Sequence, residues 1–402
     1  MASKRQCENW LKGFLNWTLP VSEAPESLLI WTGLFCLSAV LKKKVRFSKE
    51  YLKKYDIYPT TYIIFVGPPG VVRKSTSAGY GQEIIVATNK GLPVTSAAYV
   101  NLGPTSGSHV AIIDKMSEAP DGSITIISGE FGNIVSTTPD ETYDFLAKMF
   151  DSDATADRYL HSTRGHGDTA VLHPSLNILG CTTPEWMSEN TGYMLGGGFA
   201  ARTIFIFENK ARARHLFYKG VGPTVAQLNN MQEKLVTDLK YIGRTIKGEA
   251  KPENDKLAER MEKWYLGYVD KQSEKGTETF QARKHVHTLR TAMLLSVSER
   301  DDLIITEGHF DAALVLIDEV ERRLARGLSS VGRNPYSGFL YEVLDYIEVN
   351  EPIARNKVMS RFWADLQMEE LDKIVSILKL SGEIVEDSNN MLKLRKDGNK
   401  GG

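Results

Sequence analysis

The sequence predicts an α/β protein whose core is a mainly parallel sheet with crossover helices. Short β-rich runs alternate with helical stretches between residues 61 and 207; the runs are YIIFV, HVAII in a helical environment, ITIIS, LNILG and TIFIF. A second observation is the Gly/Pro-rich break directly after the first run, VGPPGVVRKST, which is typical of a loop between a strand and a helix. Because ligands of such sheets lie outside the carboxyl ends of the strands, this loop marks the expected ligand edge.

Composition limits the classes of protein. The 402 residues, 42% of them hydrophobic, are enough for two or three domains. The net charge is -1, so the chain as a whole is not basic, and any contact with a polyanion would need a local basic patch. Three separated cysteines (Cys7, Cys36, Cys181) form neither a disulfide framework nor a metal cluster, which favours a cytoplasmic location. The apolar run Leu28–Leu41 is too short to span a bilayer, so we expect a buried helix and no membrane contact.

The chain is expected to form five segments. They are an N-terminal helical collar (1–56), the α/β core (57–210), a basic and helical region (211–334), a winged-helix domain (335–396) and a disordered tail (397–402). In the helical region, the clearest helices are expected at Ala282–Val297 and Ile305–Leu328.

The winged-helix prediction rests on three amphipathic helices followed by a hairpin. The helices are expected at 339–347, 355–363 and 368–380, and the strands at 383–385 and 391–394. Residues 335–396 contain eight Lys/Arg and eleven Asp/Glu, so this domain is suited to protein contact more than to base readout.

The loop after the first strand has the residue types of a phosphate-binding loop. Glycines let backbone N–H groups face phosphate oxygens, Lys74 is placed to reach the terminal phosphates, and Ser75 supplies a hydroxyl for Mg²⁺. Five residues separate Gly67 from Arg73, and Arg73 stands where glycine is expected. A plain Gly/Pro turn is the alternative. The predicted nucleotide-binding residues are Gly67, Pro68, Gly70, Val71, Val72, Arg73, Lys74, Ser75 and Thr76.

Hydrolysis requires further groups on neighbouring strands. Glu130 ends the run ITIISGE, where a carboxylate could polarise an attacking water; capping of the next turn is the alternative. Gly129 precedes it where an aspartate often helps to hold the metal, so metal binding would rest on Ser75 and the phosphates.

Two more candidates follow later strands. Thr182 or Thr183, after LNILG, is suited to sensing the γ-phosphate, or else caps the helix that begins near Pro184. Arg202 follows a glycine-rich turn and could meet phosphate charge in its own subunit or in a neighbour; a structural ion pair is the alternative.

The order of VGPPGVVRKST, ISGEFGNIV, LHPSLNILGCTTPEWM and LGGGFAARTIFIF resembles the phage and prophage P-loop ATPases, a large family of unassigned function that is often associated with primases. The resemblance covers about residues 5 to 330. It implies a RecA-like or AAA+-like P-loop NTPase core, ATP and Mg²⁺ as cofactors, and a homo-oligomeric ring, with a hexamer favoured. It assigns Lys74 and Ser75 to nucleotide and metal, Glu130 to hydrolysis, Thr183 to sensing and Arg202 to an arginine finger.

DNA contact is predicted from local charge. Between residues 202 and 247 there are nine Lys/Arg against three acids, with aromatic residues interleaved; a solvated surface is the alternative. A basic loop at 161–167 is a second candidate. The predicted DNA-binding residues are Arg164, His166, Lys210, Arg212, Arg214 and Lys219.

Three functions remain open. The first is an ATP-hydrolysing, ring-forming helicase or translocase on single-stranded DNA, with a primase or other replication partner at the winged-helix domain. The second is an ATP-dependent DNA-binding switch, such as an initiator, a helicase loader or a transposition regulator. The third is a P-loop enzyme or scaffold without DNA, such as a kinase-like phosphotransferase.

Overall fold

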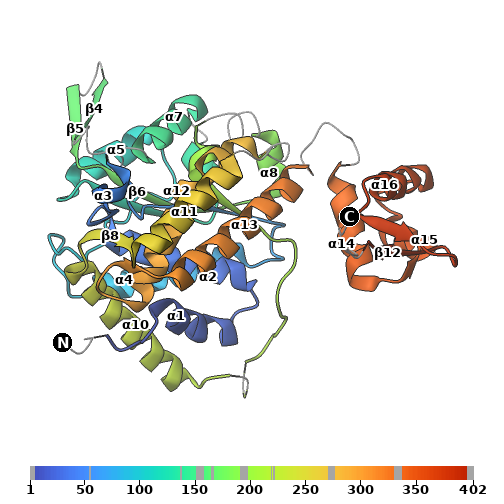
Figure 1. The fold of residues 1–402 in the computed structure, drawn as a ribbon, viewed down its shortest axis with the longest axis horizontal. Coiled ribbons are helices and arrows are strands. Elements are labelled where there is room, and N and C mark those ends of the chain that lie inside the picture. The colour runs from blue at the N-terminus through green and yellow to red at the C-terminus, as the bar shows by residue number, and fades with distance from the viewer. Residues whose placement is uncertain are drawn as a thin grey trace. The chain divides into compact units, whose positions relative to one another are not determined.

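Four parallel strands form the centre of the first of two units in the computed structural model (Figure 1). The units are Met1–Leu324 and Ala325–Gly402. The structure describes residues 5–53, 56–135, 138–150, 158–163, 167–190, 198–218, 220, 222–269, 277–329 and 337–395.

The central sheet has the strand order β3-β6-β2-β7. Its strands are β2 (Tyr62–Val66), β3 (Ser123–Ser128), β6 (Ser175–Thr182) and β7 (Thr203–Phe207). Tyr62 is in register with Ile178 on one side and Thr203 on the other, and all of these pairings are parallel. The strands are almost wholly buried, which explains their unbroken apolar runs.

Helices cover both faces of the sheet. Asn177 accepts a hydrogen bond from Ser38 in α2 (Glu26–Leu41), whereas Tyr62, one pleat away, donates its hydroxyl to Leu146 O in α7 (Pro139–Phe150). α2 therefore lies on one face, beside α4 (Lys74–Asn89), and α7 lies on the other. Because α2 is enclosed by the sheet and by other helices, it is buried on all sides, as its apolar sequence predicted.

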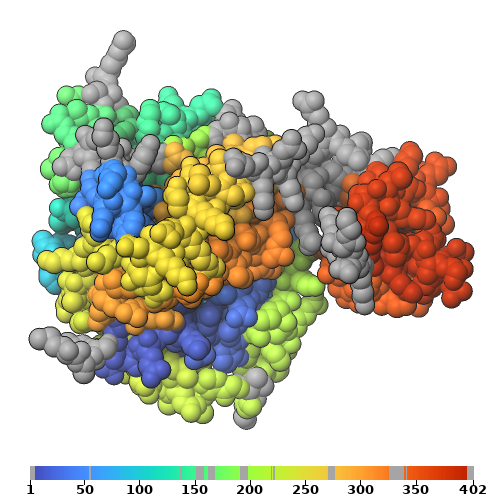
Figure 2. Space-filling view, viewed as in Figure 1, coloured from blue at the N-terminus to red at the C-terminus, as the bar shows by residue number. Residues whose placement is uncertain are grey.

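Further helices surround this core. α11 (Asp255–Val269) and α13 (Glu307–Ser329) lie side by side, yellow and orange in Figure 2, and are joined by ion pairs from Arg260 to Glu307 and Asp311. The other helices before α13, together with strands β4 and β5, are α1 (Trp10–Thr18), η1 (Leu19–Val21), α3 (Lys49–Leu52), α5 (His109–Glu118), α6 (Gly132–Val135), β4 (Arg158–Thr163), β5 (Gly167–Leu172), α8 (Pro184–Glu189), η2 (Ala200–Arg202), α10 (Val225–Thr245) and α12 (Glu278–Glu299).

A second, smaller parallel sheet joins distant parts of the chain. Its order is β1 (Val45–Phe47), β8 (Gly248–Pro252) and β9 (Ile304–Ile305). The segments 1–56 and 211–334 were expected to be helical, so these strands correct that expectation. Each is too short to be recognised alone, and each exists because a remote partner completes its hydrogen bonds.

The run HVAII was counted among the β-rich runs, and the structure shows that this was wrong. It begins α5, where Ser108 caps the helix by accepting the N–H of Ala111. Ile112, Ile113 and Met116 then face the core at helical spacing.

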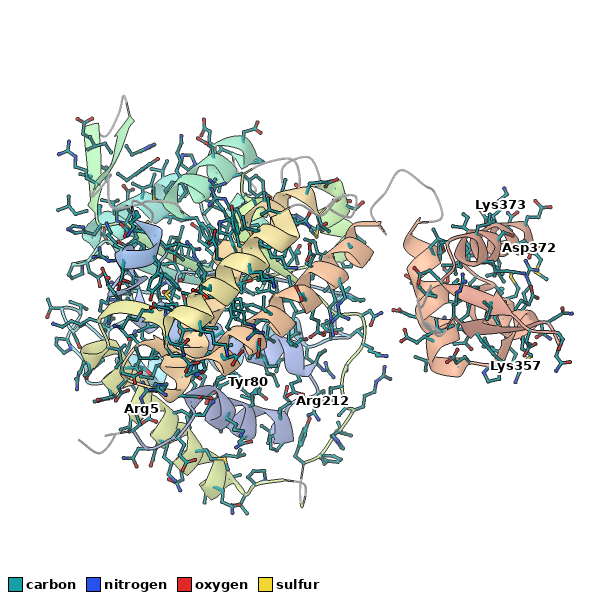
Figure 3. All side chains as sticks on the ribbon, in the orientation of Figure 1. Arg5, Tyr80, Arg212, Lys357, Asp372 and Lys373 are labelled. Atoms are coloured by element: carbon teal, nitrogen blue, oxygen red, sulfur yellow. The ribbon has the colours of Figure 1, made fainter. Side chains whose placement is uncertain are left out.

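The second unit contains the three predicted helices and the predicted hairpin. These are α14 (Ser337–Asn350), α15 (Arg355–Phe362), α16 (Met368–Leu380), β11 (Ile384–Glu386) and β12 (Met391–Leu394). A further short strand, β10 (Ile353–Ala354), pairs with β12 to give the antiparallel order β10-β12-β11. Figure 3 labels Asp372 and Lys373 on α16, and Asp372 pairs with Arg355 at 2.7 Å. The expected tail, 397–402, lies outside the described residues.

Within the described part of the chain, no helix is both long enough and apolar enough to cross a membrane.

Candidate functional site

The loop between β2 and α4 lies at the carboxyl edge of the sheet. β2 ends at Val66, and α4 begins at Lys74 with no side chain capping its first turn. The backbone N–H groups of such a first turn have no partner within the helix, and the positive end of the helix dipole lies with them. This end of α4 is therefore suited to bind an anion.

Two residues turn the loop back into the helix. Gly70 has φ +70°, and Arg73 has φ +57°, a left-handed conformation that disfavours side chains with a Cβ. Arg73 thus occupies a backbone position that glycine fills without strain. The mismatch seen in the sequence therefore has a local conformational cost.

Gly67 is required by close packing. A Cβ at this position would overlap Glu208 O and would come within 2.7 Å of Val72 Cγ2. The side chain of Val72 is buried, and Val71 is partly exposed. Val72 therefore supports the loop from the core, whereas Gly67 allows the loop to pass close to the end of β7.

Lys74 points back across the loop. Its Nζ donates hydrogen bonds to Gly67 O and, at 3.1 Å, to Pro68 O. Burial lowers the pKa of Lys74, while the more distant Cys181 and Glu185 act in the opposite direction. The ammonium is thus held by carbonyl oxygens that a stronger acceptor, such as a phosphate oxygen, can replace.

A cavity of about 530 Å³ opens beside this loop. Lys74 and Ser75 line it from α4, Glu130 lines it after β3, and Thr182 and Thr183 line it after β6. Its other lining residues are Pro69, Gly70, Arg73, Thr76, Gly129, Phe131, Gly132, Asn133, Cys181 and Trp186.

Strand order brings these residues together. β6 lies between β2 and β3, so the carboxyl ends of three neighbouring strands deliver the loop, Thr183 and Glu130 to the same edge. Glu130 is exposed, and its backbone is fixed by Ser128, whose hydroxyl donates to Glu130 O at 2.8 Å. Gly129 lies close to Ser75, since a Cβ added at Gly129 would be 4.0 Å from Ser75 Cβ.

Thr183 has a structural role that is compatible with the predicted chemical one. Its hydroxyl oxygen accepts the N–H of Trp186 at 3.2 Å and so caps α8. A hydroxyl that accepts one bond can still donate its proton, and Thr183 faces the cavity. The capping and sensing interpretations are therefore compatible.

The residues that the sequence interpretation missed include Trp186. The indole closes the cavity beside Gly132, where a Cβ would lie 2.8 Å from Trp186 Nε1. Phe131 packs edge-on against the same indole. The run LHPSLNILGCTTPEWM, which contains Trp186, contributed to the resemblance, but nothing in its spacing placed the ring at the cavity.

Arg202 lies at the opposite edge of the sheet. It immediately precedes β7, whose first residue is paired with the first residue of β2. Five strand residues at about 3.3 Å each separate it from the carboxyl edge by about 16 Å. Its Nη1 donates to Gly198 O at 2.5 Å. The structure therefore does not bring Arg202 to the cavity of its own chain; Gly196 and Gly197 lie outside the described residues.

The predicted DNA-binding residues divide into three groups. Lys210 and Arg214 are exposed on the irregular segment that follows β7. Arg212, labelled in Figure 3, instead donates to Leu19 O at 2.5 Å and to Ser22 O at 2.9 Å. Arg164, His166 and Lys219 lie outside the described residues. The expected basic loop at 161–167 is wrong in its bounds, because residues 161–163 belong to β4 and Gly167 begins β5. The two strands form an antiparallel hairpin that extends from the body of the unit (Figure 1), and residues 164–166 lie outside the described residues.

Glu23 was not among the predicted site residues, yet it joins the loop before α4 to residues 210–218, which we call the basic segment. Its Oε2 receives Arg73 Nη2 at 2.6 Å and Nε at 2.7 Å, and its Oε1 accepts the backbone N–H of His215 at 2.7 Å. Donation by the His215 N–H and by Arg73 lowers the pKa of Glu23. No periodic pattern marks Glu23, because both partners are distant in the sequence.

No metal-binding group of three His, Cys, Asp or Glu side chains is present among the described residues. The chemistry of the cavity fits a metal that is held mainly by a ligand's phosphates, with a hydroxyl such as that of Ser75 as the protein donor.

Compared with known proteins, the chain matches no protein-family model and no curated protein.

Proposed function

We propose that the protein is an ATP-hydrolysing, ring-forming helicase or translocase that acts on single-stranded DNA. The observation that carries the proposal is the convergence of Lys74, Ser75, Glu130 and Thr183 on one cavity at the N-terminus of α4. An anion-binding helix end, a lysine, a hydroxyl and a carboxylate are the groups that phosphoryl transfer to water uses.

In this proposal the loop is a P-loop, and the core is RecA-like or AAA+-like. The α4 N–H groups and Lys74 bind the phosphates of ATP, and Ser75 holds Mg²⁺, which neutralises phosphate charge. Glu130 accepts a proton from the attacking water, and Thr183 donates its hydroxyl to the γ-phosphate or to that water. These residues need no rearrangement of the strands, since all four already line the cavity.

Ring assembly follows from the position of Arg202. It is about 16 Å from the carboxyl edge of its own sheet by the strand rise, so it acts on phosphate only at the cavity of a neighbouring subunit. A site completed between subunits requires a closed assembly, for which we favour a hexamer.

The DNA contacts are proposed for the exposed cations Lys210 and Arg214 and for the β4–β5 hairpin. Phe217, 77% exposed on the same segment, is available to stack on a base. The second unit is proposed to be a winged-helix domain, and its three helices and the antiparallel β10-β12-β11 sheet support this proposal. Its α16 begins with Glu369 and Glu370, which favours a protein partner such as a primase over DNA.

A DNA-binding switch without processive unwinding is the second candidate. The position of Arg202 favours it, because Arg202 does not line the cavity of its own chain. Such a chain would bind ATP readily and would hydrolyse it only after assembly.

The test is DNA-stimulated ATP hydrolysis together with strand displacement, for wild type, Lys74→Ala and Arg202→Ala. We expect Lys74→Ala to lose hydrolysis, and Arg202→Ala subunits to inhibit wild-type subunits on mixing. DNA-stimulated hydrolysis without strand displacement supports the switch. Hydrolysis that persists in Lys74→Ala contradicts both candidates.

A further inference from the structure

The Arg73 side chain has two negatively charged environments within reach. It lines the cavity in which we place the phosphates, and it is bound to Glu23 through two nitrogens. Nearly half of the Arg73 side chain is exposed, whereas the Glu23 side chain is only 13% exposed. Arg73 is therefore the partner with room to turn toward the cavity, whereas the Glu23 carboxylate is oriented by Arg73 and by the His215 N–H.

Glu23 also holds the basic segment. Besides the bond from His215 N–H to its carboxylate, its backbone oxygen accepts the N–H of Arg212 at 2.9 Å. The side chain of Arg212 binds Leu19 O and Ser22 O in the same turn. The short turn at 19–23 is thus bonded to the loop on one side and to residues 212–215 on the other.

The segment fixed in this way presents unusual side chains. Leu216 is 86% exposed and Phe217 is 77% exposed, directly after the bonded His215. Two adjacent large apolar side chains on irregular backbone need a reason to remain exposed. Their position next to Arg214 suits contact with a base and a phosphate of a single strand.

We propose that the chain Arg73–Glu23–His215 couples nucleotide binding to the DNA-contacting segment 210–218, with Arg73 and Glu23 as positioning residues. The inference rests on the proposed function, since it requires phosphates at the loop. Bound phosphate attracts the Arg73 guanidinium away from Glu23. The Glu23 carboxylate then loses the two Arg73 contacts that orient it, so it can rotate away from the His215 N–H, and the segment becomes free to close on single-stranded DNA. This role explains why arginine is kept at a left-handed position that suits glycine.

Arg73→Gly is the decisive variant. Glycine relieves the backbone conformation at residue 73 and restores the usual residue before the lysine, so the variant is expected to fold and to bind nucleotide at least as well as wild type. Arg73→Lys keeps the charge but loses the two-nitrogen contact, and should respond partially. Glu26→Gln removes a charge three residues from Glu23 and serves as the matched control.

Two measurements are made on each full-length chain. Amide hydrogen exchange of residues 208–218 is followed with and without Mg²⁺–ATP, and the affinity for oligo-dT is measured in both states. In wild type and Glu26→Gln we expect ATP to raise exchange and to tighten oligo-dT binding about tenfold. In Arg73→Gly and Glu23→Gln we expect exchange and affinity to be nearly independent of ATP.

The outcomes separate the two proposals. If wild type binds no ATP, the proposed function fails, and the coupling fails with it. If wild type binds ATP and Arg73→Gly shows the same ATP response as wild type, only the coupling is overturned. If Glu26→Gln loses the ATP response as fully as Glu23→Gln does, the coupling is overturned as well. The response would then depend on the total charge of this region and not on the contact between Arg73 and Glu23.

Discussion

The two edges of the central sheet differ in how they use polar side chains. At the carboxyl edge, Lys74, Ser75, Glu130 and Thr183 line a cavity, and Glu130 is exposed. At the amino edge, buried cations are engaged by the fold: Arg290 donates to Thr60 O at 2.9 Å and lies 3.8 Å from the centre of the Phe150 ring.

Polar side chains at the carboxyl edge line the cavity, whereas those at the amino edge are bonded within the fold. His287, also at the amino edge, is buried, donates from Nε2 to Ala201 O at 2.9 Å, and stacks on Phe280. Substitutions at the carboxyl edge should therefore change nucleotide chemistry with little loss of stability. Changes at the amino edge should do the opposite, except at Arg202, for which we propose a role at the cavity of a neighbouring subunit.

The largest expected effect is that of Glu130→Gln. Removing the proposed base should lower the rate of ATP hydrolysis by about 10²- to 10⁴-fold, while ATP affinity is unchanged. Single-turnover hydrolysis and equilibrium ATP binding measure the two quantities. Glu118→Gln, at the end of α5, is the control. A hydrolysis rate within threefold of wild type would remove Glu130 from the proposed mechanism.

Lys74→Ala should weaken ATP binding by about 100-fold, because a charge-assisted contact to phosphate is lost in a partly buried position. A fluorescent ATP analogue gives the affinity, and thermal unfolding gives the stability. Lys90→Ala, just beyond the other end of α4, should change neither. A large loss of stability in Lys74→Ala would show that the lysine mainly holds the loop carbonyls.

At the amino edge, we expect stability to fall under mild acid. Burial lowers the pKa of His287 to about 3. The unfolded chain takes up this proton below about pH 6.5 and the folded chain does not, so the free energy of unfolding decreases as pH falls. The contribution is about 2 kcal/mol by pH 5. Urea unfolding between pH 7 and 5 measures it, and His287→Gln should lose this part of the slope. Equal slopes in both chains would contradict a buried neutral histidine.

Thr183 connects the two parts of this comparison, because it caps α8 and is also proposed to contact the γ-phosphate or the attacking water. Thr183→Val should cost about 1 kcal/mol of stability through the lost cap of α8, and should also slow hydrolysis. Thr183→Ser should retain both. If Thr183→Val loses stability but hydrolyses ATP at the wild-type rate, the hydroxyl is a cap alone.

Much of the fold was predictable where local patterns are strong. The helix expected at 368–380 coincides with α16, and the runs YIIFV and TIFIF coincide with β2 and β7. The error at HVAII came from its apolar composition, which a strand and a buried helix share. Ser108 was the signal that would have separated them, because a serine before an apolar run is a helix cap.

The candidate site was predictable in its residue types and only partly in its geometry. Glycines, Lys74 and Ser75 after a buried strand identify a phosphate-binding pattern by themselves. That Glu130 and Thr183 share the cavity depends on β6 lying between β2 and β3, and strand order is not encoded by any single strand. That Arg202 does not share it depends on the same order and direction.

The sequence by itself determined the strongly patterned elements, such as β2, β7 and α16, and the loop with the chemical groups it carries, because these follow from local periodicity and backbone preference. Only the tertiary structure decided which groups meet. It paired Arg73 with Glu23, fixed Arg212 to the turn at 19–23, and enclosed Trp186 beside Gly132. Each of these contacts joins residues that are distant in the chain, and such pairs are selected by packing, which no local pattern records.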